Sequence, residues 1–198
     1  SNLAIYKKAT EDNPHGLQFD DIAGYTTVGN RNTKRLYFPI SQCSWVYDSG
    51  AAAPVIVTPT TFGSSTFGVA THSSAIRGGL HIPNSANTFY TYFTGQAEVP
   101  TADAPVFGIL YIPSVTSNAQ ISWNLRFDAP NPTTTDSYTL VDTTSRTNGT
   151  IVDFQSSALS TFYTNIGGFM FHLRFGRTGG DSYTGDVLVL GAYLQYNA

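Results

Sequence analysis

The fold is decided by residues 121–128, which read ISWNLRFD. Every second position is large and apolar, and the positions between them carry a hydroxyl, an amide, a guanidinium and a carboxylate. A strict period of two over eight residues predicts a β-strand with one face buried and the other face polar. The apolar face of this strand is expected to place Trp123 in the protein core.

The same alternation recurs nearer the C-terminus, where residues 169–175 read FMFHLRF. A glycine-rich connection follows, and residues 186–196 form the expected last strand, which should lie antiparallel to 169–175. Elsewhere, short apolar runs are separated by turn residues about every ten positions, the pattern of an all-β chain. These further strands are expected at 22–28, 36–40, 44–47, 55–58, 66–70, 80–83, 88–94, 106–112, 138–142 and 150–156.

So many strands in 198 residues must close or stack, because open sheet edges pair with other chains. We therefore predict an all-β protein, an antiparallel jelly-roll sandwich formed as a single domain by residues 17–198. Residues 1–16 are polar and end in turn formers, so they are expected to be an N-terminal extended arm or linker. The dipeptide Asn148-Gly149 predicts a hairpin turn before the strand at 150–156.

Composition excludes several classes of function. Charged residues make up 12% of the chain, with ten Lys and Arg against 13 Asp and Glu and a net charge of −3. This balance argues against a nucleic-acid partner. Apolar runs all fall short of the ~20 residues that cross a bilayer, so no membrane partner is expected.

Two expected strands are apolar on both faces. In residues 106–112 and again in 186–196, apolar side chains occupy odd and even positions alike. Such a strand in an antiparallel sheet needs cover on its second face. Either another subunit or a loop of the same chain would supply it. The candidate subunit-interface residues are Phe107, Ile109, Tyr111, Val187, Val189, Tyr193 and His172.

The residues that carry acid–base or metal chemistry are scattered. Asp181 and Asp186 flank the glycine-rich connection and are the pair most able to approach each other, as a glycosidase requires. Together with Ser182 they would also offer oxygen ligands to calcium. Aspartates in such loops more often accept backbone N–H bonds, and the histidines are not at metal-ligand spacing. We therefore predict no catalytic residues, no bound metal and no cofactor.

Aromatic side chains in loops are candidates for a different use, because they stack on sugar rings. Packing inside the protein is the alternative for each of them. The candidate glycan contacts are Tyr25, Tyr47, Tyr163 and Tyr183.

The ordered series of strands over residues 80–196 resembles a jelly-roll domain of phage virion proteins, found in fibres, spikes and capsid decoration proteins. In that pattern a short apolar strand closed by proline precedes an aromatic strand. A strand that is apolar on both faces and an alternating strand with a tryptophan come next. The matching segments here are LHIP at 80–83, FYTYF at 89–93, 106–112, 121–127, FHLRFGR at 171–177, DSYTGDV at 181–187 and LGAYLQY at 190–196.

The resemblance implies a non-enzymatic viral structural protein, a homotrimer on the virion surface. It would be made in the host cytoplasm and be extracellular as part of the particle. Its partners would be major capsid or tail proteins, with host surface glycan as a further partner. The role would be capsid decoration (cement) or fibre and spike, and the polar arm favours cement. The alternative is a carbohydrate-binding or host-receptor-binding module, while a glycan-cleaving enzyme is disfavoured by the scattered acids.

Overall fold

The chain is described by a computed structural model. The described residues are 18–20, 25–29, 33–40, 45–48, 58–64, 68–72, 77–84, 89–96, 104–128, 135–159, 170–178 and 181–197. The expected arm at 1–16 and most of the expected strand at 55–58 lie outside them. The strands are β1 (Gln18–Asp20), β2 (Tyr25–Gly29), β3 (Thr33–Pro39), β4 (Trp45–Asp48), β5 (Gly68–His72), β6 (Arg77–Ile82), β7 (Phe89–Gln96), β8 (Val106–Pro113), β9 (Ile121–Asp128), β10 (Thr135–Asp142), β11 (Val152–Ala158), β12 (Met170–Arg177) and β13 (Val187–Asn197).

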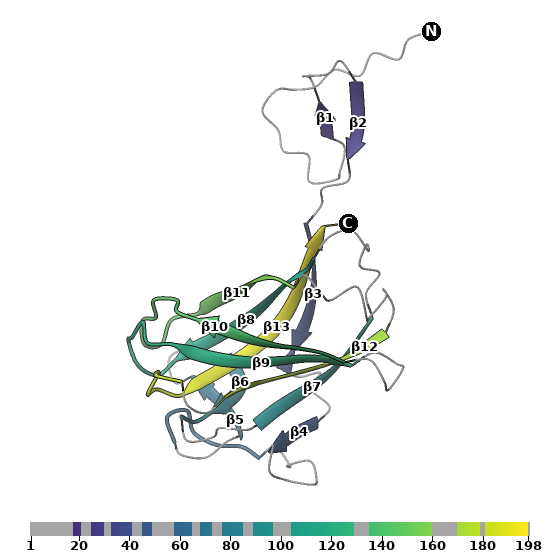
Figure 1. Ribbon diagram of the computed structural model, residues 1–198. Helices are drawn as coiled ribbons and strands as arrows, with labels where there is room; N and C mark the ends of the chain where they lie inside the picture. The colour runs from purple at the N-terminus through teal and green to yellow at the C-terminus, as the bar shows by residue number, and fades with distance from the viewer. Residues whose placement is uncertain are drawn as a thin grey trace.

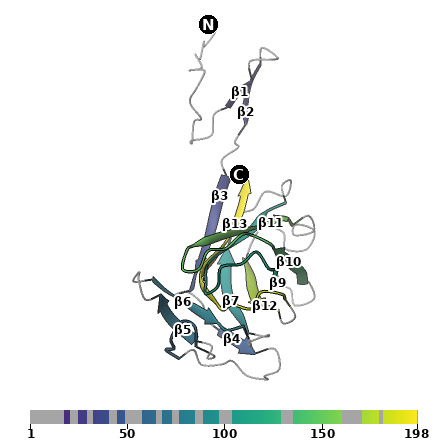
Figure 2. The same cartoon turned by 90° about the vertical axis from the view of Figure 1, so that its left-hand side faces the viewer.

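Two antiparallel sheets form the body of the protein (Figure 1). One has five strands in the order β10-β9-β12-β7-β4, and the other has six, in the order β11-β8-β13-β6-β5 with β3 also paired to β13. β3 lies alongside the C-terminal half of β13 (Figure 2). The pair β1–β2 is a sheet of its own. The predicted all-β jelly-roll sandwich is confirmed, and no helix of the described residues is long and apolar enough to cross a membrane.

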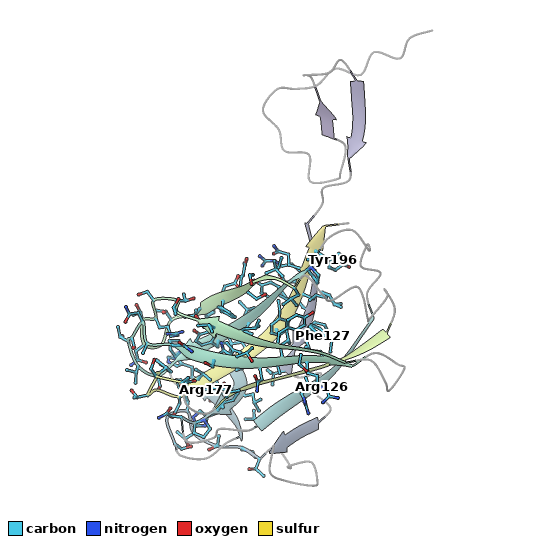
Figure 3. All side chains as sticks on the ribbon, in the orientation of Figure 1. Arg126, Phe127, Arg177 and Tyr196 are labelled. Carbon is cyan, nitrogen blue, oxygen red and sulfur yellow. The ribbon has the colours of Figure 1, made fainter. Side chains whose placement is uncertain are left out.

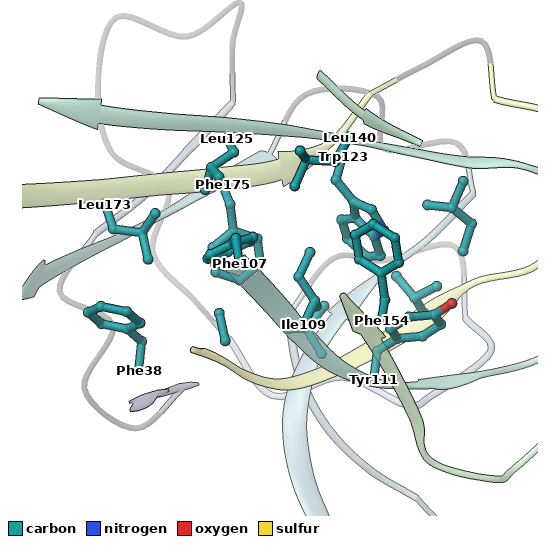
Figure 4. Close-up of a cluster of buried hydrophobic side chains, with 14 of the residues drawn as sticks. Phe38, Phe107, Ile109, Tyr111, Trp123, Leu125, Leu140, Phe154, Leu173 and Phe175 are labelled. Carbon is teal, nitrogen blue, oxygen red and sulfur yellow. The ribbon is translucent and has the colours of Figure 1, made fainter. Parts of the chain in front are cut away.

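The main core lies between the two sheets and is lined by the apolar face of β9. Trp123 is fully buried and its ring is tilted against that of Tyr111, with 5.6 Å between ring centroids (Figure 4). Further along, Phe107 of β8 makes edge contacts with Phe127 and Phe175 at 6.4 and 5.8 Å. The predicted burial of Trp123 is therefore confirmed.

The second apolar face of β8 and β13 is covered by the same chain. Ile112 of β8 and Leu188 of β13 form a second small cluster with Ala70 of β5, and Phe62 packs against it. Phe62 belongs to the segment 58–64, whose Thr60 N–H donates to the Val69 carbonyl at 2.8 Å. Of the two sources of cover considered, the loop of the same chain is the correct one here.

Most candidate interface residues consequently lie inside the protein. The inference that they need a second subunit was wrong, because two sheets of one chain bury them between layers. This correction applies to Phe107, Ile109, Tyr111, Val187 and Val189, which all belong to the main core.

Tyr193 is also buried, but on the opposite side of its sheet. The register between β13 and β8 shifts between Val189 and Gly191, which marks a β-bulge. A bulge adds one residue and reverses which side chains face the core. Strict alternation placed Tyr193 on the face of Val189, whereas the bulge brings Leu194 into the core and leaves Tyr193 on the outer face. There it is covered by Tyr37 and by Arg35, whose guanidinium carbon lies 4.5 Å from the ring centroid.

Two expected connections also differ from the structure. β12 and β13 are not paired with each other, because they belong to opposite sheets. Asn148-Gly149 does form a tight turn, with Gly149 at φ +76° and a 3.1 Å bond from the Thr150 N–H to the Thr147 carbonyl. That turn joins β10 of one sheet to β11 of the other, so it is not a hairpin. In both pairs, β12–β13 and β10–β11, the two consecutive strands belong to opposite sheets, so their apolar faces meet across the core and their backbones do not pair.

Candidate functional site

Of the four candidate glycan-contact tyrosines, Tyr183 has a described side chain and it is buried. Its hydroxyl donates to the Val115 carbonyl and accepts from the Val115 N–H, both at 3.0 Å. The guanidinium carbons of Arg146 and Arg177 lie over its ring, 5.1 and 5.4 Å from the ring centroid. Desolvation by this burial raises the pKa of the Tyr183 phenol. The prediction was wrong for Tyr183, because packing and not exposure explains an aromatic side chain in this loop.

The side chains of the remaining candidates lie outside what the structure describes. The side chains of Tyr25, Tyr47 and His172 are not among the described ones, and neither is any part of Tyr163. Their proposed glycan or subunit contacts stay predictions.

A buried polar cluster closes one end of the sandwich. Arg146 pairs with Asp142 at 3.0 Å, and its Nε donates to the Tyr111 hydroxyl at 2.6 Å. That hydroxyl donates in turn to the Asp142 carboxylate at 2.6 Å. Burial and the bond to Asp142 raise the pKa of Tyr111 well above its ordinary value. Each member satisfies the others, so the cluster holds strands together and leaves no reactive group open to a ligand.

The two aspartates of the glycine-rich connection are held apart by separate partners. Asp181 forms two bonds with Arg177, at 2.7 and 2.8 Å. Asp186 accepts from the Asn84 N–H at 2.8 Å and lies 3.2 Å from His81 Nε2. The described residues contain no cluster of three or more metal-binding side chains. These two carboxylates therefore stabilise the structure of the loop. A glycosidase pair or a calcium site would instead bring both carboxylates to one ligand.

Both aspartates were expected to accept backbone N–H bonds within their own turn. The bonds that the structure describes come instead from N–H groups of other segments. Asp181 accepts from Ser122 of β9 at 3.4 Å, and Asp186 accepts from Asn84 after β6. The loop is thereby tied to both sheets.

The polar face of β9 forms a groove on the outer side of the five-stranded sheet. The alternation of β9 places Phe127 in the core and Arg126 on the other side of the strand (Figure 3). The groove has a volume of about 160 Å³. It is lined by Asn124, Leu125, Arg126, Ser137, Tyr138, Thr139 and Arg174.

The register of the sheet aligns the groove residues in rows that cross all five strands. In the first row, Ser137 of β10 faces Arg126 of β9, which faces Arg174 of β12. The same row continues through Tyr92 of β7 to Trp45 of β4. Directly paired residues share one face of a sheet. The row therefore runs from a hydroxyl through two guanidiniums to two aromatic positions.

The second row lies two residues further along each strand. Thr139 of β10 faces Asn124 of β9, and the threonine hydroxyl lies 3.4 Å from the amide oxygen. Gly176 of β12 comes next and adds no side chain to the face. Tyr90 of β7 and Tyr47 of β4 complete the row. Together the two rows present amide, hydroxyl and guanidinium groups beside four aromatic positions.

The groove is shallow and polar in character. It is smaller than the ~300–1,000 Å³ pockets that enclose drug-sized ligands. Arg126, Asn124 and Arg174 are half-buried, so their polar groups are partly oriented by their surroundings and still reach the surface. Such a site suits a ligand that lies across the sheet and offers many hydroxyl groups. One unit of that ligand would occupy the groove.

The sequence analysis did not predict this face, because its candidate glycan contacts were aromatic side chains in loops. The signal was present in the polar positions of 121–128 and of 172–174, which alternate with core positions. The pattern did not show which strands are neighbours in the sheet. Strands β9 and β12 are more than 40 residues apart in the chain, yet they pair directly and bring Arg126 opposite Arg174.

Comparisons with known proteins give no family for this chain. No protein-family model matches it. No curated protein matches it either.

Several solved structures are similar to this chain at low sequence identity. A xylan-binding module, CBM15, is 8% identical, with a TM-score of 0.49, over 84% of this chain and 99% of the module. The CBM36-1 domain of a multidomain xylanase from the hindgut metagenome of Trinervitermes trinervoides is 9% identical, with a TM-score of 0.45, over 81% of this chain and 96% of that domain. CBM35 from Cellvibrio japonicus Abf62 is 14% identical, with a TM-score of 0.38, over 83% of this chain and 95% of that module. At these identities the likeness concerns the fold.

Proposed function

We propose that this protein binds carbohydrate on the outer face of its five-stranded sheet and does not cleave it. The observation that carries the proposal is the groove, where Asn124, Arg126 and Arg174 from two paired strands converge with hydroxyls of β10. This was the alternative function expected from the sequence, now assigned to the outer face of a sheet.

The chemistry of the groove matches what sugar hydroxyls require. The Asn124 amide offers both donors and an acceptor, and the hydroxyls of Ser137 and Thr139 donate and accept. Guanidinium groups donate several N–H bonds in one plane. Aromatic residues occupy the adjoining positions of both rows, at Tyr92 and Trp45 in the first. The many donors and acceptors of the groove favour a ligand rich in hydroxyl groups over a small apolar ligand.

Binding without cleavage is supported by where the acids lie. Among the described residues that line the groove, none carries a carboxylate. Glycoside hydrolysis ordinarily needs two carboxylates across one glycosidic bond. Asp142 and Asp181 are paired with buried arginines, and Asp153 accepts the Tyr193 hydroxyl at 2.5 Å. These acids have structural tasks away from the groove.

The biological setting stays a prediction from the resemblance to phage virion proteins. On a fibre or spike, a glycan-binding face would attach the particle to a host surface. The cement role, the homotrimer and the virion location are also predictions of that resemblance. Quantification of this chain in purified particles would separate them, because a decoration protein is present in many more copies than a tail protein.

The test of carbohydrate binding is a glycan array probed with the immobilised protein, with acidic and neutral glycans both represented. Binding is expected, and Asn124→Ala and Thr139→Ala should each weaken it. The matched control is Thr71→Ala, an exposed threonine on β5 of the other sheet. The absence of binding to every glycan, or equal loss in the Thr71 variant, would overturn the proposal. Release of new reducing ends from a bound polysaccharide would overturn the non-enzymatic part.

A further inference from the structure

We infer that the ligand of this groove is an anionic polysaccharide whose carboxylate or sulfate groups bind Arg126 and Arg174. The inference rests on the proposed carbohydrate binding and narrows it to one class of glycan. Its basis is the placement of two guanidiniums side by side on one sheet face.

The two arginines are direct cross-strand neighbours. Arg126 of β9 and Arg174 of β12 are paired in register, and both line the groove. Paired residues have Cβ atoms about 4.5–5.5 Å apart, so one anionic group can reach both guanidiniums. Both side chains are half-buried, so water screens their attraction for a bound anion less than it would at a fully exposed site.

The groove carries positive charge on a chain that is negative overall. The chain has a net charge of −3. Among the described residues that line the groove, Arg126 and Arg174 are the charged ones, and no carboxylate accompanies them. A positive patch on an otherwise acidic protein attracts anionic ligands, whereas the acidic remainder of the surface repels them.

The shape of the guanidinium group fits carboxylate and sulfate. Its planar fork donates two parallel N–H bonds to two oxygens of one anionic group, and such charge-assisted bonds are stronger than neutral ones. Ser137 stands beside Arg126 in the same row, and Asn124 lies in the next. The arginines would then hold the acidic group while Ser137 and Asn124 bind the hydroxyls of the same sugar ring.

The experiment compares polysaccharides that differ only in charge. Polygalacturonate is paired with its fully methyl-esterified form, and dextran sulfate is paired with dextran. Affinity of the full chain for each is measured by calorimetry or affinity electrophoresis at physiological salt. We expect at least ten-fold tighter binding to the charged member of one pair. Which pair responds identifies the anionic group as carboxylate or sulfate, and either result supports the inference.

Variants then test whether the groove is responsible. Arg126→Gln and Arg174→Gln should each reduce binding to the charged polysaccharide at least ten-fold. The control is Arg35→Gln, on the other sheet, where the arginine covers Tyr193. Thermal unfolding of each variant shows whether the fold is retained, and Arg126→Lys, which keeps charge without the fork, should restore only part of the affinity.

Each outcome separates the inference from the function on which it rests. Equal binding to charged and neutral members, weakened by Asn124→Ala, would overturn the anionic ligand and keep carbohydrate binding. Binding to the charged members that Arg35→Gln reduces as strongly as Arg126→Gln would show non-specific attraction and overturn the inference. Failure to bind any of the four polysaccharides would overturn the inference, and failure on the glycan array as well would overturn the proposed function.

Discussion

Arg177 and Asp181 form a two-pronged ion pair inside the protein, with Nε–Oδ2 at 2.7 Å and Nη2–Oδ1 at 2.8 Å. Their side chains are only 2% and 3% exposed. Arg177 also donates to the carbonyls of Gly185 and Tyr183, so one guanidinium organises the whole connection between β12 and β13. The strand β12 ends on this residue, and the final crossover between sheets starts there.

Loss of the Asp181 carboxylate should therefore destabilise the fold strongly. Asp181→Ala leaves a buried guanidinium without its counter-charge, a change that costs about 3–5 kcal/mol. This exceeds the ~1 kcal/mol of a single neutral hydrogen bond that a turn-capping aspartate would contribute. Urea denaturation measures the difference. Thr184→Ala, at an exposed position of the same loop, is the control and should change stability little. Equal stability of the two variants would contradict the role given to the pair.

Truncation of Trp123 should be similarly costly. The side chain fills the core between the sheets against Tyr111, and its removal in Trp123→Ala leaves a cavity worth about 3–5 kcal/mol of unfolding free energy. Fluorescence gives an independent reading. The emission lost in Trp123→Phe, which keeps Trp45 as the remaining emitter, should be that of an indole shielded from water. A lost component with water-exposed emission would show that Trp123 is not in the core.

A methyl group at position 108 should disrupt the outer face of the six-stranded sheet. A Cβ on Gly108 would lie 2.0 Å from Cζ of Tyr193. The ring cannot easily move, because its hydroxyl binds Asp153 and Arg35 lies over it. Gly108→Ala should cost about 1–3 kcal/mol.

Two further variants check this steric cause. Gly78→Ala is the matched control, since an added Cβ there meets nothing within 4 Å. Adding Tyr193→Ala to Gly108→Ala removes the clash, so the two substitutions together should cost less than their separate sum. Additive costs would rule out the clash as the cause.

Stability should fall at alkaline pH because Tyr111 keeps its proton in the folded state. Burial and the bond to Asp142 hold its pKa well above the ~10 of an unfolded chain. Above about pH 10 the folded state binds more protons than the unfolded state, so the unfolding free energy decreases as pH rises. Each such tyrosine contributes up to ~1.4 kcal/mol per pH unit.

Denaturation curves collected from about pH 8 to about pH 11 test this. Tyr111→Phe should show a smaller decrease than the wild type over the alkaline part of the range. Tyr193 has a raised pKa for the same reason, desolvation, so some decrease should remain in that variant. An identical pH dependence in wild type and Tyr111→Phe would contradict the assignment.

Local alternation explains why the fold class was predictable. In residues 121–128 and 171–175, side-chain polarity changes at every position, and a pleated strand is the conformation that separates such positions onto two faces. The burial of Trp123 follows from that pattern alone. The tight turn at Gly149 was also predictable, because glycine has no Cβ and adopts a positive φ without steric cost.

Long-range pairing determined what the sequence did not reveal. Whether β12 joins β9 or β13 depends on which faces pack across the core, and no local pattern contains that choice. The bulge at Leu190 likewise depends on the register of β13 against β8, and it reverses the faces of Tyr193 and Leu194. Those two residues were therefore assigned to the wrong sides.

By itself, the sequence determined that the chain is a jelly-roll sandwich with a polar face on the strand at 121–128, because period-two patterning is a local property. Only the tertiary structure decided that a loop of the same chain covers the second apolar face at Leu188. It also decided that Arg126 meets Arg174 across a strand pair to form the groove. Both are contacts between segments distant in the chain, and they are selected by how two sheets bury their apolar faces against each other.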